Sequence, residues 1–379
     1  MTELLVVAGE ASGDRAGAAV LRRLEGVRAF GLGGPAIGGT GAAIVDDMRA
    51  WTAMGIGEAG ARAARVLRAW RAVVNAVRAR RPRAALLVNY TEFNLRLAPR
   101  LRAAGVRVLW YGAPQVWAWR PERARSLRRC VDRLAVMFPF EEDPWRRAGV
   151  DAHYVGHPAL ETTPLDRDAA RRALDMTMYA AAVAVLPGSR PHEVRRLLVP
   201  MLDAYEQVRS DRASIDARVL VAPSLDRPTR TWVRATCQAR HVATFDVDPN
   251  LGAMSVLTAF DASLCASGTA SLEAALARAV PVVAYRVGVT TELAARTLLR
   301  TPYVALPNVL LGRPVFRELL QRDARAARIA EALADALDRR PQLLTACKEV
   351  AASLQIAGPP SAHVAQMLAP WLRDRSRAA

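Results

Sequence analysis

Ser267 to Glu273, with the sequence SGTASLE, is the stretch whose residue types and spacing are best suited to chemistry. An apolar run precedes it, a helical pattern begins inside it, and a second apolar run covers residues 280–285. That order predicts a strand, a tight turn, a helix and a second strand. Gly268 would let a ligand approach the backbone closely, and the hydroxyls of Ser267 and Thr269 could cap the helix.

The start of this predicted helix could bind a phosphate. The backbone N–H groups around Thr269 and Ala270 would point at an anion, and the helix dipole would favour its negative charge. Glu273 follows Thr269 by four residues, whereas a capping box needs a spacing of three. Its carboxylate could therefore accept hydrogen bonds from a sugar diol. The stretch predicts a site for a nucleotide diphosphate, and a well-capped helix with an acidic first turn is the alternative interpretation.

The same order of elements occurs earlier in this half of the chain. An apolar run over residues 181–186 is followed by Gly188 and Ser189, and then a helix is predicted. Arg190 stands at the start of that helix, where its guanidinium could form two parallel hydrogen bonds to a phosphate. A surface arginine beside a capped helix is the alternative.

Carboxylates follow two predicted strands in the first half of the chain. Glu10 and Asp14 come after the apolar run 4–8, and Glu92 comes shortly after the run 86–88. Open α/β sheets bind ligands at the carboxyl ends of their strands, so these groups are expected near a site. Glu92 is the best general-base candidate in this half. Capping, turn-forming or structural roles for the three carboxylates stay open.

A loop after the predicted strand 106–110 combines aromatic residues with proline and glycine, a composition that suits a sugar or an acyl group. Packing of the aromatic rings into the core is the alternative. A shorter glycine-containing loop precedes it in the chain. Together the two loops supply the candidate acceptor residues Met54, Gly55, Gln115, Trp117, Trp119 and Arg120.

These motifs need a scaffold of parallel strands and helices, and the chain is long enough to form about two such domains. The predicted boundaries are residues 1–163, 164–356 and 357–379, the last a closing helix with a basic tail. Its four cysteines form no CxxC pair, which favours reduced thiols. No apolar run reaches the roughly 18 residues of a membrane span, and the first run is too short for a signal peptide.

The formal net charge of +17 predicts an anionic partner: nucleic acid, an acidic membrane face or a phosphorylated substrate. The cations are almost all arginine, with Lys348 as the only lysine. Residues 62–81 form an amphipathic pattern in which arginines occupy the polar positions. This helix could simply cover the sheet, or it could dock on an anionic bilayer.

Nine short motifs occur in an order that resembles the lipid-A-disaccharide synthase family along nearly the whole chain. They are AGEASGD (8–14), MGI (54–56), FN (93–94), PQVWAWR (114–120), PFE (139–141), VGHP (155–158), LPGSR (186–190), SGTASLE (267–273) and LPNVLLGR with ELLQ (306–321).

This resemblance implies a GT-B fold, an α/β architecture of two Rossmann-like parallel-sheet domains that face each other across a cleft. It implies an inverting transfer of 2,3-diacylglucosamine from UDP to the 6-hydroxyl of 2,3-diacylglucosamine 1-phosphate, giving a β-1,6 linkage. No metal or other cofactor is implied. The enzyme would lie on the cytosolic face of the inner membrane, bound to its anionic surface, and a homodimer is compatible with this.

In that reading UDP binds to the second domain. Asn308, at the end of a strand predicted over 301–308, would complete the nucleotide pocket together with Gln321. Gln321 is expected one turn after Glu318 on the following helix. The tryptophan loop and the glycine loops of the first domain would hold the acyl sugars.

The resemblance departs from the family pattern in one motif. After the strand 86–88 the family pattern is Asp-x-Pro-Asp-Phe-Asn, and this chain has Asn89-Tyr90-Thr91-Glu92-Phe93-Asn94. An amide cannot accept a proton, so Asn89 cannot act as the base that the first aspartate of the family is suspected to be. Glu92 replaces the second aspartate and could compensate, with Glu10 and Asp14 as further candidates.

Other functions stay open beside this one. The chain could be a divergent GT-B enzyme with a different acceptor, or an enzyme that uses UDP-N-acetylglucosamine, such as an epimerase or a muramyl-type transferase. The tryptophan-rich loop argues against the latter. A binding protein that lost catalysis through Asn89 is a third reading. A nucleic-acid binder would explain the charge, but no nucleic-acid motif supports it.

Overall fold

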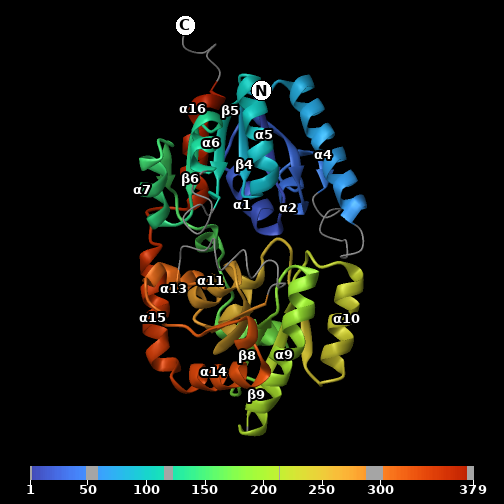
Figure 1. The fold of residues 1–379 in the computed structure, drawn as a ribbon, viewed down its shortest axis with the longest axis vertical. Coiled ribbons are helices and arrows are strands. Elements are labelled where there is room, and N and C mark those ends of the chain that lie inside the picture. The colour runs from blue at the N-terminus through green and yellow to red at the C-terminus, as the bar shows by residue number, and fades with distance from the viewer. Residues whose placement is uncertain (1, 48–58, 115–122, 213, 287–301, 374–379) are drawn as a thin grey trace. The chain divides into compact units, whose positions relative to one another are not determined.

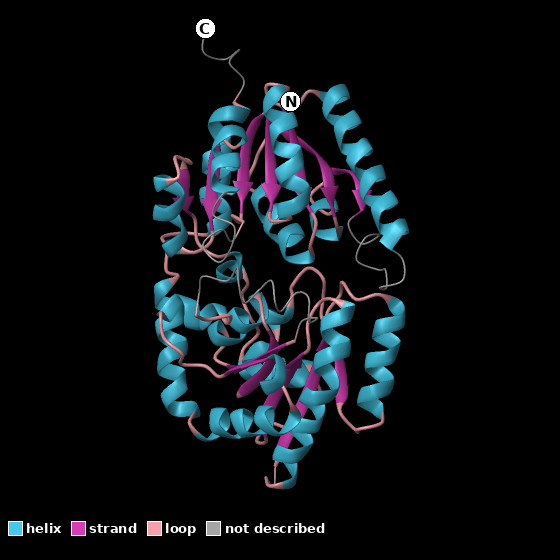
Figure 2. Cartoon of the chain, in the orientation of Figure 1, coloured by secondary structure: helices cyan, strands magenta, loops and turns pink. Residues whose placement is uncertain are grey.

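The computed structural model describes residues 2–47, 59–114, 123–212, 214–286 and 302–373. The chain divides into two compact units, Met1–Glu161 with Ile356–Ala379 and Thr162–Gln355. Each unit is built on one sheet with helices packed against it, and the registered strand pairs are all parallel (Figures 1 and 2). The two parallel sheets and their helices are the α/β class that the sequence predicted.

The first sheet has seven strands in the order β3-β2-β1-β4-β5-β6-β7. Its central strands are continuous apolar runs that are buried on both faces, as parallel strands between two helix layers must be. The strands are β1 Thr2–Ala8, β2 Val27–Gly33, β3 Ala43–Asp47, β4 Ala84–Val88, β5 Arg107–Tyr111, β6 Arg133–Val136 and β7 Ala152–Tyr154.

The helices of the first unit cover both faces of this sheet. Val73 of α4, Leu97 of α5 and Leu127 of α6 pack into one core with alternate residues of the strands. On the other face, α16 lies beside α1 although it comes from the far end of the chain (Figure 1). The helices are α1 Ala11–Leu21, α2 Pro35–Gly38, α4 Ala59–Arg80, α5 Thr91–Ala103, α6 Arg123–Cys130, α7 Pro139–Arg147, the 3₁₀ helix η1 Pro158–Glu161 and α16 Pro360–Leu372.

The second sheet has six strands in the order β10-β9-β8-β11-β12-β13. They are β8 Ala181–Leu186, β9 Ile215–Val221, β10 Ala243–Asp246, β11 Ala262–Ala266, β12 Val280–Tyr285 and β13 Glu318–Leu320. The helices are α8 Arg167–Ala173, α9 Pro191–Ser210, α10 Arg227–Gln238, α11 Thr269–Leu276, α13 Leu306–Leu311, α14 Ala326–Asp338 and α15 Arg340–Ser353. Three 3₁₀ helices join them, η2 Ala253–Ser255, η3 Leu257–Ala259 and η4 Gln321–Asp323.

Helix α4 has the amphipathic character that its sequence predicted. Ala69 and Val73 are buried against the sheet, while Arg68 and Arg71 are exposed on the outer side. Leu67 stands on the same outer side and is 48% exposed. Of the helices within the described ranges, none is long and apolar enough to span a bilayer.

Candidate active site

The carboxyl ends of β8 and β11 mark the point where the strand order of the second sheet reverses. From β8 the chain continues to β9 and β10 on one side, and from β11 it continues to β12 and β13 on the other. Doubly wound sheets bind ligands just outside such a point. Residues 187–190 follow β8 and residues 267–273 follow β11, and the two strands pair up to Leu186 and Cys265. The two segments predicted to hold the diphosphate therefore leave the sheet from neighbouring strands.

The turn after β8 is held in shape by Glu193, a buried residue of the first turn of α9. One oxygen of its carboxylate accepts a hydrogen bond from the Ser189 N–H (3.3 Å), and the other accepts one from Arg190 Nη1 (3.3 Å). Gly188 has φ +122°, and a Cβ there would lie 2.7 Å from the Glu193 carboxylate. Ser224 Oγ donates to the Ser189 carbonyl (2.9 Å). Arg190 is thus anchored at the start of α9 with its side chain 57% exposed.

The turn after β11 differs from the predicted capping. Gly268 is the N-cap residue of α11 (φ +137°), and neither Ser267 nor Thr269 caps the helix with its side chain. Ser267 Oγ instead donates to the Val304 carbonyl (3.3 Å), and Thr269 is exposed in the first turn. Among the described residues, no atom lies within 4 Å of a Cβ placed on Gly268. The start of α11, with Ala270 in its first turn, is therefore open to an anion.

Asn308 does not lie at the end of a strand, and Glu318 does not lie on a helix, so the predicted elements over 301–321 are wrong. Asn308 belongs to α13 and is fully buried, and Glu318 begins the short strand β13. The Asn308 amide donates to the Phe316 carbonyl (2.8 Å) and to the Glu318 carboxylate (2.7 Å). Its oxygen accepts from the N–H groups of Val315 (3.0 Å) and Phe316 (2.9 Å). These four bonds make Asn308 a support of the loop rather than a surface for a nucleotide.

Glu318 also stabilises this loop, a role that its sequence position does not indicate. Its carboxylate accepts the N–H groups of Val304 (2.9 Å) and Ala305 (3.1 Å) in addition to the Asn308 amide. The Val304 carbonyl also accepts a hydrogen bond from the Ser267 hydroxyl. Glu318 therefore connects the segment before α13, through Val304, with the turn after β11.

Gln321 comes directly after β13 and has a left-handed backbone conformation (φ +53°). Its carbonyl accepts a hydrogen bond from Arg286 Nε (3.3 Å), which follows the neighbouring strand β12. Tyr285, the last residue of β12, has its pKa raised by burial and further by the charge of Glu193. The ends of β8, β11, β12 and β13 therefore gather Arg190, Glu273 and Gln321 at one edge of the second sheet.

The first sheet reverses its strand order between β1 and β4. The turn from Gly9 follows β1, and the turn from Asn89 follows β4, so the predicted carboxylates of the first unit also surround a reversal point. Asn89 donates its N–H to the Tyr111 carbonyl (2.9 Å), and its own carbonyl accepts the Asn94 amide (2.9 Å). A Cβ on Gly112 would lie 2.0 Å from Asn89 Oδ1, so the Asn89 side chain fills the space that this glycine leaves.

The carboxylates of the first unit have different surroundings. Asp14 is buried, and its oxygens accept the N–H groups of Gly34 (2.7 Å), Ala36 (2.9 Å) and Ile37 (3.2 Å) at the start of α2. It therefore caps a neighbouring helix, the structural role that the sequence leaves open beside the predicted catalytic one. Glu10, the N-cap residue of α1, and Glu92, in the first turn of α5, are both exposed.

The six predicted acceptor residues lie outside the described residues: Met54, Gly55, Gln115, Trp117, Trp119 and Arg120.

Comparison with known proteins assigns the chain to a family. Residues 4–357 match the family model described as lipid-A-disaccharide synthetase. The lipid-A-disaccharide synthase of Anaeromyxobacter dehalogenans (strain 2CP-C) is 40% identical over 367 residues, covering 94% of each chain. The chain belongs to the lipid-A-disaccharide synthetase family. It is therefore an enzyme, a glycosyltransferase of lipid A biosynthesis.

Solved structures place this family member in the GT-B fold. A UDP-GlcNAc 2-epimerase from Neisseria meningitidis, solved with UDP-GlcNAc bound, covers 98% of this chain and 100% of its own (TM-score 0.66, 10% identity). Acinetobacter baumannii MurG covers the same shares (TM-score 0.54, 15% identity). At such identities the likeness concerns the fold, and it confirms two Rossmann-like units.

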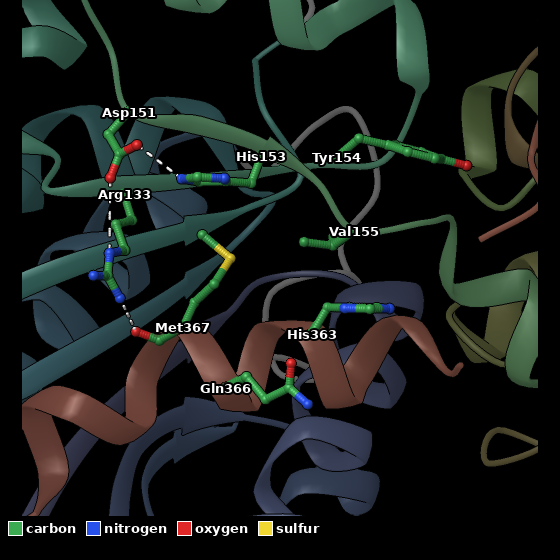
Figure 3. A pocket seen from close by; sticks show the side chains of 8 residues that line it. All are labelled: Arg133, Asp151, His153, Tyr154, Val155, His363, Gln366 and Met367. Atoms are coloured by element: carbon green, nitrogen blue, oxygen red, sulfur yellow. Dashed lines mark hydrogen bonds and ion pairs between the residues drawn. The ribbon is translucent and has the colours of Figure 1, made fainter. Parts of the chain in front are cut away.

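The first unit also has a pocket between the edge strand β7 and α16 (Figure 3). Asp151 Oδ1 accepts a hydrogen bond from His153 Nε2 (2.8 Å), and Asp151 Oδ2 lies 3.7 Å from Arg133 Nε. Arg133 Nη1 also donates to the Met367 carbonyl (2.6 Å). Arg133 of β6 thus bonds to a backbone carbonyl of α16, and this contact attaches the helix to the sheet. Among the described residues that line the pocket, none is a predicted site residue.

Proposed function

We propose that this enzyme transfers 2,3-diacylglucosamine from UDP to the 6-hydroxyl of 2,3-diacylglucosamine 1-phosphate and forms the β-1,6-linked lipid A disaccharide with inversion. The observation that carries the proposal is the reversal point of the second sheet, where Arg190 and the open start of α11 follow neighbouring strands. The family supports this proposal, since its members are named as synthases of the lipid A disaccharide.

The leaving group is the diphosphate of UDP, and the second unit is suited to stabilise its developing charge. The Arg190 guanidinium stands at the start of α9, and the backbone of Gly268 to Ala270 forms the start of α11. A guanidinium and two helix starts supply hydrogen-bond donors and positive potential at fixed positions. Glu193 accepts a hydrogen bond from Arg190 (3.3 Å) and so restricts the positions that this side chain can take before the ligand binds.

The nucleoside would occupy the same edge of the sheet. Glu273 lies one turn into α11, where its carboxylate can accept the ribose hydroxyls, and Gln321 follows β13. Asn308 and Glu318 would support the nucleotide pocket without touching the nucleotide, because their hydrogen bonds fix the backbone of residues 304–316.

The acceptor hydroxyl needs a base. In the proposed step its oxygen bonds to the anomeric carbon of the donor, the bond from that carbon to the UDP oxygen breaks, and Glu92 takes the hydroxyl proton. Asn89 cannot accept this proton, and the oxygens of Asp14 are occupied by three N–H groups. Glu10 is the remaining carboxylate at the reversal point of the first sheet.

A turnover assay with UDP-2,3-diacylglucosamine and its 1-phosphate acceptor tests this function. We expect a disaccharide product and equimolar UDP, both dependent on the acceptor. UDP release without the acceptor would favour an epimerase-like or different transferase reaction. Tight UDP binding without any turnover would favour a binding protein that has lost catalysis.

Glu92→Gln tests the base. A general base contributes about 10²- to 10⁴-fold, so kcat should fall by that factor while UDP binding is retained. Asn89→Asp is the matched variant, because it restores the carboxylate of the family pattern. Activity of Glu92→Gln within about threefold of wild type would remove Glu92 from this role.

The lipid substrates also require contact with a membrane, and we place this contact on α4. Its exposed side presents Arg68, Arg71 and Arg78 together with Leu67. Basic helices with exposed apolar residues bind anionic bilayers, such as the cytosolic face of an inner membrane. Flotation with anionic vesicles should recover the protein, and the triple change of these arginines to glutamine should release it. Equal flotation with neutral vesicles would contradict an electrostatic contact.

A further inference from the structure

Tyr90 has an unusual backbone conformation at the reversal point of the first sheet. Asn89 (φ +48°) and Tyr90 (φ +43°) are consecutive left-handed residues between β4 and α5. Asparagine tolerates this region, whereas a bulky aromatic residue adopts it only when its surroundings compel it. Strain of this kind tends to occur at functional sites.

The end of β1 provides one side of the support for Tyr90. A Cβ on Gly9 would lie 2.3 Å from Cγ of the Tyr90 ring, and 2.5 Å and 2.6 Å from the two Cδ atoms. Gly9 is not among the residues with positive φ, so its backbone does not require glycine. The residue is glycine because the ring of Tyr90 rests directly on its backbone.

A chain of aromatic residues provides the other side. The Tyr90 ring stacks on Phe93 of α5 with centroids 5.3 Å apart and planes at 23°. Phe93 meets the edge of Trp70 on α4 at 5.4 Å, and the Arg100 guanidinium lies 4.8 Å from the Trp70 ring centre. The ring is therefore held between Gly9, directly after β1, and Phe93 of α5, which in turn packs against Trp70 of α4.

We propose that Tyr90 is a positioning residue: its ring, seated on Gly9, holds the left-handed turn that sets the directions of Asn89 and Glu92. Tyr90 is the N-cap residue of α5, so its backbone angles decide where the first turn of that helix, with Glu92, begins. The same angles keep the Asn89 side chain against Gly112 and Gly13. This inference rests on the proposed function in one respect: one of its two tests measures kcat of the proposed transfer reaction.

A double-mutant cycle of Gly9→Ala and Tyr90→Gly tests the proposal. Tyr90→Gly adopts the turn without strain but lacks the ring, so kcat should fall about 10- to 100-fold with KM for the UDP-sugar within about twofold. Gly9→Ala should have a similar effect in the wild type because it displaces the ring. In the Tyr90→Gly background it should cost less than about twofold, since no ring is left to displace.

Tyr90→Phe keeps the ring and should retain at least about half of kcat. Trp371→Ala, which removes a half-buried ring stacked on Arg133 at the amino edge of the same sheet, controls for loss of an aromatic residue in general. The melting temperatures of the four cycle proteins report the contact between Gly9 and Tyr90 without any substrate.

Equal losses from Gly9→Ala in both backgrounds would show that Gly9 serves the approach of a ligand, and would overturn the proposal. A loss in Tyr90→Phe as large as that in Tyr90→Gly would overturn it too, because the hydroxyl would then be the acting group. If the wild-type enzyme transfers no sugar between these substrates, the proposed function fails, and the melting-temperature cycle still decides whether the ring depends on Gly9.

Discussion

Arg190→Ala should weaken the binding of UDP about 10- to 30-fold while leaving the KM for the acceptor nearly unchanged. A hydrogen bond to a charged group contributes about 1.5–3 kcal/mol. Because the Arg190 side chain is 57% exposed, solvent screening reduces this, and about 1.5–2 kcal/mol is a reasonable expectation. That free energy corresponds to the stated change in Kd.

Isothermal titration with UDP measures this change, and steady-state kinetics with each substrate varied in turn measures the selectivity. Arg195→Ala is the matched control, because Arg195 lies five residues further along the chain, on α9, and stacks over Trp232 at 5.4 Å. It should change the Kd for UDP by less than about twofold.

The double variant Arg190→Ala/Glu193→Gln separates two explanations. Removal of Arg190 leaves the buried Glu193 carboxylate beside the expected diphosphate, so neutralising Glu193 should recover part of the lost affinity. Full recovery would mean that Arg190 only neutralises Glu193 and does not bind the phosphate. A Kd for Arg190→Ala within about twofold of wild type, or equal effects on donor and acceptor, would refute the reasoning.

Three further predictions concern Asp14, Glu318 and the buried His157. Asp14→Ala leaves three buried N–H groups of α2 without an acceptor, so urea unfolding followed by tryptophan fluorescence should show a loss of about 3 kcal/mol; a loss below about 1 kcal/mol would contradict the capping role. Glu318→Ala should lower the free energy of unfolding by about 2 kcal/mol and weaken UDP binding indirectly, whereas an intact stability with lost binding would indicate direct contact. Burial lowers the pKa of His157 from 6.5 to about 4, so its contribution to stability is complete above pH 6.5 and is lost as the pH falls toward 4. The loss over this range should be about 3 kcal/mol and should be absent in His157→Gln; an identical pH dependence in that variant would rule out His157 as its source.

Much of the fold could be predicted because its signals are local. The apolar runs 4–8, 181–186 and 280–285 coincide with β1, β8 and β12 to within two residues, and the helix predicted over 62–81 is α4. Hydrophobic periodicity and turn-forming residues such as glycine and proline are properties of short segments, so they can be recognised without a structure. The family assignment rests on the same kind of information, since its motifs are short contiguous segments.

The errors occurred where short elements or distant partners decide the structure. The strand β13 has three residues and is followed by a 3₁₀ helix of three residues. Both are too short for a strand or helix periodicity to appear, so the sequence predicts a helix for Glu318 and Gln321. Asp14 was a candidate base because its partners, the N–H groups of α2, lie 20 to 23 residues further along the chain. The partner of Gly9 is a ring 81 residues away, and nothing in the local sequence points to it.

The sequence by itself determined that strand, turn and helix units carry Gly188 to Arg190, Ser267 to Glu273 and Asn89 to Asn94, because backbone sterics and hydrophobic periodicity act over a few residues. The tertiary structure alone decided that β8 pairs with β11 and β1 with β4, so that these turns leave each sheet as neighbours. It also decided which polar side chains are occupied by backbone groups and which remain exposed. Strand order and hydrogen-bond partners depend on contacts between distant segments, and those contacts form only when the whole core packs.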